Sequence, residues 1–174
     1  ALARAARRRL SFAGRAAPLL ITTEIAMYKH ILIATDGSEL AQKAEVAGLA
    51  LAKELRTQAT AVVVTEPWDA FSMAALADRN VPNPVGDYDE CVAASANRIL
   101  WGVGETVKKL GVTCTTVHVK DSYPAAGILQ TAKEKGCDLI VMASHGRKGI
   151  SKMLLGSQTT KVVTLSTVPV LVCR

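Results

Sequence analysis

The segment "HILIATDGSE", residues 30–39, carries the pattern that decides the fold. Its first six residues form a short, continuous and mainly apolar run, which is typical of a strand buried on both faces of a parallel sheet. Ser38 can then cap a helix, and Glu39 places an acid in the first turn of that helix. A buried strand that passes directly into a helix predicts an α/β unit.

The same alternation continues to the end of the chain. After the first strand, we expect strands at residues 60–64, 112–119, 138–143 and 168–173. After the first helix, we expect helices at residues 88–110, 124–135 and 157–166, with a long crossover at residues 66–87. This order predicts an α/β fold with one mostly parallel sheet and helices on both faces. Ligands of such sheets bind beyond the carboxyl ends of the strands, where the strand order reverses.

The spacing of apolar residues also indicates which helix faces are buried. For the first helix, the expected buried stripe is Leu40, Ala44, Ala47, Leu51 and Leu55. For the long helix it is Val92, Ala96, Ile99, Val103, Val107 and Leu110. Trp68, Phe71 and Trp101 are read as packing residues, although Trp68 lies in the crossover and a place in a pocket stays open for it.

The length and composition limit the classes of protein to consider. A chain of 174 residues corresponds to one domain, and no window approaches 18 uninterrupted apolar residues, so we expect no membrane span. The net charge is +6, but residues 1–26 hold five arginines and one glutamate and so account for +4 of it. The nearly balanced remainder shows no basic stripe, which argues against nucleic-acid binding.

Residues 1–26 differ in composition from the rest of the chain. They are rich in Arg and Ala and poor in acids, like a transit peptide, but they could equally be translated sequence upstream of a true start at Met27. The abrupt start of a domain at Met27 favours the second reading. We therefore expect a disordered basic extension at 1–26 and one domain at 27–174.

Neither the cysteines nor the histidines cluster along the sequence. Four cysteines lie far apart without a C-x-x-C pair, and the three histidines are scattered, so no metal site is expected. Reduced, mostly buried thiols in a cytosolic protein are the simplest reading.

Asp36 follows the first strand, so its carboxylate is expected at the carboxyl edge of the sheet. There it can accept hydrogen bonds from a vicinal diol of a sugar, or it can simply serve as a turn or cap residue. Neither G-x-G-x-x-G nor G-x-x-x-x-G-K-[ST] occurs here, so phosphates of a bound nucleotide would have to be held elsewhere.

The segment after the fourth strand offers such a place. Gly146 allows close approach of its backbone to an anion, and Gly156 and Ser157 open the next helix, where free N–H groups favour an anion. Arg147 or Lys148 could supply charge. The alternative is a glycine turn and a serine cap beside a solvated basic loop.

Four segments together resemble the universal stress protein family over nearly all of residues 27–174: "ILIATDGS", "GCDLIVMASHGRKG", "LLGSQTTKVV" and "STVPVLVCR". The nucleotide-binding members of that family carry G-x2-G-x9-G-[ST]. This chain has Ala143-x2-Gly146-x9-Gly156-Ser157, so three of the four positions match and Ala143 replaces the first glycine. The added methyl group is expected to weaken rather than abolish nucleotide binding.

The resemblance implies a Rossmann-like, doubly wound open sheet of five mainly parallel strands in the order 3-2-1-4-5. It also implies an ATP site, with Mg²⁺ as counter-ion held through phosphate oxygens and water. Ala34, Thr35 and Asp36 would line the adenosine part, with Asp36 on the ribose, and Val64 would contact adenine through its backbone. The remaining implied contacts to ribose and phosphates are Met142, Ala143, Gly146, Arg147, Gly156, Ser157 and Gln158.

The last strand predicts a partner. Residues 168–173 are apolar and include Pro169, which indicates an edge strand, and an exposed apolar edge needs a cover. The resemblance implies a homodimer through Val168 to Cys173, whereas a covered edge in a monomer is the alternative.

Two functions remain open at this stage. The first is a dimeric, cytoplasmic stress-response regulator that binds ATP with slow or no hydrolysis, at most weak hydrolysis or autophosphorylation. The second is a non-nucleotide family member that acts through dimerisation, an unknown protein partner or phosphorylation. No catalytic residue is assigned, because His145 has no Asp or Glu between residues 139 and 158 to orient it and is read as a loop imidazole bonded to backbone.

Overall fold

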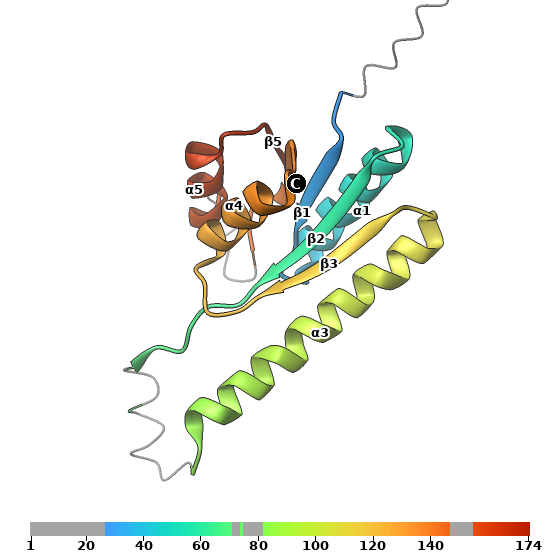
Figure 1. Cartoon of the computed structure of the whole chain (residues 1–174). Coiled ribbons are helices and arrows are strands. Elements are labelled where there is room, and N and C mark those ends of the chain that lie inside the picture. Colours follow the sequence, from blue (N-terminus) through green and yellow to red (C-terminus); the bar gives the residue numbers. More distant parts are fainter. Residues whose placement is uncertain (1–26, 71–73, 75–81, 147–154) are drawn as a thin grey trace, which may run out of the picture.

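A single five-stranded parallel sheet forms the centre of the computed structural model, which describes residues 27–70, 74, 82–146 and 155–174. The strands are β1 (His30–Ala34), β2 (Gln58–Val64), β3 (Cys114–Val119), β4 (Leu139–Ala143) and β5 (Val170–Cys173). Their order is β3-β2-β1-β4-β5, and all four pairings are parallel. The predicted fold class and strand order are therefore confirmed (Figure 1).

Helices cover both faces of this sheet (Figure 1). They are α1 (Glu39–Glu54), α3 (Pro84–Leu110), α4 (Pro124–Lys135) and α5 (Ser157–Leu165). On one face, Ile31 and Ile33 of β1 pack with Leu49 of α1 and with the C-terminal part of α3. On the other face, Leu32 of β1 packs with α4 and α5. Alternate residues of β1 thus serve two cores, which explains why its sequence is continuously apolar.

Local signals fix the helix ends. Ser38 caps α1 by accepting a hydrogen bond from the Ala41 amide at 3.3 Å. The long helix α3 begins at Pro84, four residues before the predicted start, because Asn83 caps it and proline is compatible with a first helical turn. Gly111 and Gly136 end α3 and α4 in the left-handed conformation, which glycine adopts without steric cost.

The predicted buried stripe of α1 is wrong by about one residue. The buried positions are Ala41, Ala44, Glu45, Gly48, Leu49 and Ala52, whereas Ala47 is exposed. Gly48 explains part of this rotation, since a Cβ there would lie 2.9 Å from two side-chain carbons of Ile33. The missing side chain lets α1 approach the sheet closely, so the helix turns this face inward.

One consequence is a buried carboxyl group, because only 5% of Glu45 is exposed. Burial raises the pKa of Glu45, and a hydrogen bond with Thr106 of α3 offsets part of that effect. The pKa of Glu45 is higher in the folded than in the unfolded state. The free energy of unfolding therefore decreases as pH rises from the unfolded pKa through the folded pKa, and it stays lower at neutral pH.

We therefore expect Glu45→Gln to raise the melting temperature at pH 7, because the amide needs no ionisation and can keep a bond to Thr106. The gain should shrink below the unfolded pKa of 4.5, where glutamate is protonated in both states. Thermal unfolding of both proteins at pH 7 and pH 4 measures this. The assignment would be contradicted if the difference in melting temperature between Glu45→Gln and the parent were less favourable to the variant at pH 7 than at pH 4.

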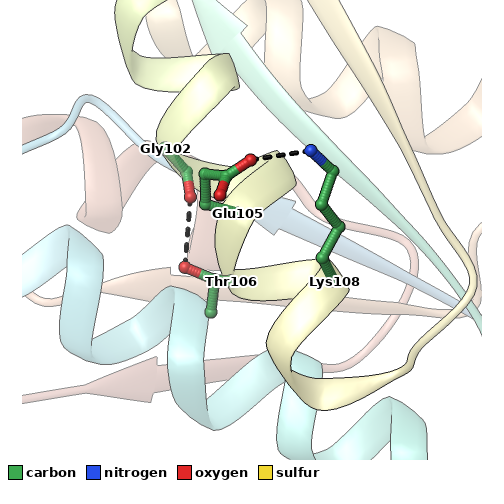
Figure 2. Close-up of polar contacts among 4 residues, drawn as sticks. All are labelled: Gly102, Glu105, Thr106 and Lys108. Carbon is green, nitrogen blue, oxygen red and sulfur yellow. Dashed lines mark hydrogen bonds and ion pairs between the residues drawn. The ribbon is translucent and has the colours of Figure 1, made fainter.

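The C-terminal half of α3 carries two side-chain contacts within the helix (Figure 2). There the Thr106 hydroxyl donates to the Gly102 carbonyl at 3.2 Å, and the Lys108 ammonium lies 2.7 Å from the Glu105 carboxylate. Trp101 on this half is 70% exposed, so its reading as a packing residue is wrong. Trp68 is also exposed, and Phe71 lies outside the described residues.

The cysteines are free, but fewer are buried than predicted. Cys137 is buried, Cys114 and Cys173 are half-buried, and Cys91 is exposed. Burial raises the pKa of the Cys114 and Cys137 thiols to about 11, so both are protonated at neutral pH. The basic extension at 1–26 lies outside the described residues, and no described helix is long and apolar enough to cross a membrane.

Candidate functional site

A cleft of about 520 Å³ lies at the carboxyl edge of the sheet, where β1 and β4 end. The chain leaves β1 for α1 on one face and leaves β4 for α5 on the other, which is the usual place for a ligand in a doubly wound sheet. Ten of the eleven predicted site residues line it: Ala34, Thr35, Asp36, Val64, Met142, Ala143, Gly146, Gly156, Ser157 and Gln158. The eleventh, Arg147, lies outside the described residues.

The turn after β1 holds the Asp36 carboxylate in place. The Ser38 amide donates to its Oδ1 atom at 3.0 Å, and Gly37 makes the turn with a φ of 76°. The Thr35 amide donates to the carbonyl of Val62 at 3.0 Å, which ties the turn to β2. Asp36 therefore has the local contact expected of a turn residue, with its second carboxylate oxygen directed elsewhere.

That second oxygen, Oδ2, faces the segment after β4. A Cβ atom placed on Gly146 would lie 2.8 Å from Oδ2 of Asp36, which is closer than a Cβ atom comes to a neighbouring atom in real proteins. The two strand ends thus come together at this point, and Gly146 makes room for the Asp36 carboxylate.

The start of α5 lies at the cleft, and no side chain of the described residues caps it. Its N-cap, Gly156, has no side-chain oxygen, and the first turn contains no acid. The Gly156 amide donates to the Ser144 carbonyl at 2.8 Å, which fixes the helix end beside β4. Thr159 strengthens this junction, since its hydroxyl donates to the Ala143 carbonyl at 3.0 Å. Helix N-termini of this kind favour anions.

The methyl group of Ala143 has a place in the core. Ala143 is 7% exposed and forms a buried cluster with Ala41 and Ala44 of α1. The departure from the glycine motif is therefore accommodated by small side chains on the neighbouring helix, although Ala143 also lines the cleft.

His145 lines the cleft beside these groups. Its Nδ1 atom lies 3.2 Å from the buried Ser144 hydroxyl, so its partner is a side chain rather than the predicted backbone. Its Nε2 atom is buried, with no hydrogen-bond partner among the residues that the structure describes. No acidic side chain orients the ring in any recorded contact among the described residues.

The far wall of the cleft was not predicted from the sequence. It comes from the first half of α3, through Tyr88, Val92, Ser95, Ala96 and Ile99. The Tyr88 hydroxyl donates to the carbonyl of Glu66 at 3.1 Å, which joins α3 to the segment after β2. The sequence predicts a buried face of this helix that includes Val92, Ala96 and Ile99. The helical spacing of these apolar residues is the signal that they face inward, where they line the cleft.

The end of β2 forms one side of the cleft. A Cβ atom on Gly127 of α4 would lie 2.7 Å from Val64, so this glycine lets α4 pack onto the strand end. Thr65 follows Val64 and also lines the cleft, with its hydroxyl 2.9 Å from Nε2 of His118 on β3. Sequence alone gives no sign of this pair, because its members lie 53 residues apart.

Comparison with known proteins agrees with this architecture. Residues 27–174 match the model of the universal stress protein family. The universal stress protein YxiE of Bacillus subtilis is 34% identical over 149 residues, which are 85% of this chain and 100% of YxiE.

Solved structures share the fold. Universal stress protein UspA from Lactobacillus plantarum has a TM-score of 0.72 and 22% identity, over 84% of this chain and 98% of UspA. A universal stress protein from Archaeoglobus fulgidus in complex with dAMP has a TM-score of 0.61 and 17% identity, over 84% and 98%. A further universal stress protein, in complex with cAMP, has a TM-score of 0.60 and 20% identity, over 83% of this chain and 95% of that protein. On the family model and the similarity to YxiE, this chain belongs to the universal stress protein family.

Proposed function

We propose that the cleft binds ATP, accompanied by Mg²⁺, and that the protein is a dimeric cytoplasmic regulator whose state depends on the bound nucleotide. The observation that carries this proposal is the meeting of Asp36 and the glycine-flanked start of α5 at one cleft. A carboxylate beside uncapped helix amides provides an acceptor for sugar hydroxyls and donors for phosphates at adjoining positions.

Each part of the nucleotide has a counterpart in the cleft. The base would lie at the end of β2 beside Val64, and the ribose hydroxyls would donate to Oδ2 of Asp36. The phosphates would accept hydrogen bonds from the amides and hydroxyl of Ser157 and its neighbours at the start of α5. Gln158 is partly committed, because its Oε1 atom accepts a hydrogen bond from the Ala125 amide at 3.2 Å.

The size of the cleft and the known complexes support this choice. A volume of about 520 Å³ lies within the range of small-molecule sites. Two proteins of the same fold are described in complex with cAMP and with dAMP, both adenine nucleotides. ATP is proposed because α5 begins at the cleft with no acid in its first turn, and helix N-termini favour anions such as a chain of phosphates.

Magnesium would be held mainly by the phosphates and by water. Mg²⁺ keeps several waters in phosphate sites and needs few protein ligands. The Asp36 carboxylate is the acidic group that lines the cleft near the start of α5, and it is assigned to the ribose. Magnesium therefore neutralises phosphate charge here, without a dedicated protein cage.

Hydrolysis should be slow, since efficient attack by water needs a positioned general base. His145 is the imidazole that lines the cleft, and the contact recorded for it is with the neutral Ser144 hydroxyl. Among the described residues, no carboxylate is seen to hold the ring in a defined orientation. We therefore assign no catalytic residue.

The edge strand β5 and the adjoining helix α5 would form the dimer interface. Val163 and Leu165 of α5 and Leu171 of β5 are 44%, 63% and 42% exposed. Exposed apolar side chains at a sheet edge favour pairing with a second copy.

We expect Leu171→Glu to convert the dimer to a monomer, because pairing across a two-fold axis would bury two like charges. Sedimentation equilibrium of the full chain measures this, with Val46→Glu as a matched control at an exposed apolar position on α1. A parent protein that sediments as a monomer would contradict the proposed interface.

Calorimetric titration of ATP–Mg²⁺ into the full chain tests the nucleotide site. We expect micromolar binding in the parent and loss of binding in Gly156→Val. A Cβ at Gly156 already lies 3.3 Å from the Ser144 carbonyl, so a branched side chain would displace the start of α5. Absence of heat at millimolar ATP would sink the proposal and leave a family member that acts through protein partners.

A further inference from the structure

Thr65 is held firmly at the base end of the cleft. Its amide donates to the Val119 carbonyl at 2.9 Å, and its carbonyl accepts from the Ser122 amide at 3.1 Å. Its hydroxyl oxygen lies 2.9 Å from Nε2 of His118 and 3.4 Å from the Val119 carbonyl oxygen. The backbone is fixed, so the variable property of this residue is the direction of its hydroxyl proton.

His118 controls that direction. When the ring is neutral with its proton on Nδ1, Nε2 is an acceptor, and the Thr65 hydroxyl donates to it at the shorter of the two distances. The lone pairs of Thr65 are then available to a donor in the cleft. When the ring is protonated, Nε2 donates to Thr65, and the hydroxyl proton must turn to the Val119 carbonyl or to an acceptor in the cleft.

We propose that neutral His118 carries its proton on Nδ1 and so sets the hydrogen-bond polarity of Thr65, and that in this tautomer the base end of the cleft selects a 6-amino purine over a 6-oxo purine. This assignment rests on the proposed nucleotide site, because it places the base beside Val64 and therefore beside Thr65. The 6-amino group donates to the Thr65 oxygen, whereas a 6-oxo group meets a second acceptor.

The surroundings of His118 keep it neutral at ordinary pH. Partial burial of the imidazole lowers its pKa, and the positive charge of Lys120, just after the end of β3, lowers it further. Four acids, Glu66, Asp69, Asp89 and Asp121, act on Tyr88, and of these Glu66 lines the cleft together with Tyr88. The selective state is thus present above the His118 pKa, which lies below the ordinary value of 6.5, and is lost as pH falls through it.

The test compares ATP with inosine triphosphate, which differs only at the 6-position and N1 protonation of the base. Both carry the same phosphates, so the ratio of their dissociation constants cancels phosphate titration. We expect calorimetry on the full chain to give a preference for ATP of about tenfold at pH 8. In the inosine triphosphate complex, the 6-oxo acceptor would face the Thr65 oxygen, which is also an acceptor. The preference should fall toward unity as pH drops below the His118 pKa.

Two variants locate the effect. Thr65→Val removes the hydroxyl, and His118→Ala removes the titrating group, so both should abolish the pH dependence of the ratio. His30→Ala is the matched control, because His30 Nε2 makes a similar contact of 2.8 Å with the Thr60 hydroxyl at the opposite end of the sheet. His30→Ala should keep the pH dependence of the ratio. If His118 has only a structural role, His118→Ala should change the melting temperature without changing the ratio of the two dissociation constants.

Titration of the His118 ring by NMR gives a second readout. If ATP binds the neutral form about tenfold more tightly, its binding must lower the pKa of His118 by about one pH unit. A ratio that is independent of pH, or an equal pH dependence in Thr65→Val or His118→Ala, would overturn the assignment while leaving the nucleotide site intact. Failure of both nucleotides to bind would remove the nucleotide site and this assignment together.

Discussion

Replacing Gly146 with valine is expected to weaken ATP binding at least about 100-fold, or about 2.7 kcal/mol, while leaving the fold intact. The new Cβ would lie 2.8 Å from Oδ2 of Asp36. Because Oδ2 ends a side chain, the Asp36 carboxylate can move away from the new Cβ while the backbone of the fold stays in place. That movement takes the ribose acceptor out of position and puts an apolar side chain between the strand ends.

Calorimetry with ATP–Mg²⁺ measures the loss, and thermal unfolding checks the fold. Gly104→Val is the matched control, because a Cβ at Gly104 of α3 meets nothing within 4 Å. Dideoxy-ATP lacks the ribose hydroxyls and should bind the parent weakly. If the effect passes through Asp36 and the ribose, Gly146→Val should therefore reduce the affinity for dideoxy-ATP much less than the affinity for ATP. Unchanged ATP affinity in Gly146→Val would remove Asp36 from the site.

Replacing Ile140 with alanine is expected to lower the free energy of unfolding by about 3–4 kcal/mol. Ile140 is fully buried in β4 and packs in the core shared with α4 and α5. Its amide also donates to the Pro169 carbonyl at 3.0 Å, so β4 holds β5 in the sheet at this residue. Loss of three carbons leaves a cavity that the paired strands on both sides cannot collapse to fill.

Urea unfolding of the parent and of two variants measures this loss. Ile140→Val removes one carbon at the same place and should cost only about 1 kcal/mol. Val46→Ala on α1 is the exposed counterpart outside the proposed dimer interface and should cost much less, since 50% of Val46 is exposed. A loss below about 1 kcal/mol for Ile140→Ala would mean that this strand does not form the centre of the core.

The sheet could be predicted because its central strands carry continuous apolar runs that only burial on both faces explains. The inward face of α1 could not, since alanine occupies buried Ala44 and exposed Ala47 alike, and Glu45 lies on the buried side. The start of α3 was placed too late because Pro82 and Pro84 are typical of loops, whereas Pro84 occupies a first helical turn.

The cleft could be predicted in part for a similar reason. Residues next to strand ends, such as Asp36 and Gly156, are placed by topology, because parallel strands end at one edge of the sheet. The Thr65–His118 pair and the wall from Tyr88 to Ile99 depend on how α3 and β3 pack at long range. The pair has no local sequence signal. For the wall, the spacing of Val92, Ala96 and Ile99 indicates a buried face but does not show that this face borders a cavity.

The most direct test of the nucleotide site is amide NMR of the full chain during titration with ATP–Mg²⁺. The account predicts that the largest shifts fall at Asp36, Gly146, Gly156 and Ser157, with smaller shifts at Val64 and Thr65. Amides at the opposite edge of the sheet, such as His30 and Asp138, should not move. No shifts at millimolar ATP, or shifts centred on that opposite edge, would contradict the claim that the ends of β1 and β4 hold a nucleotide.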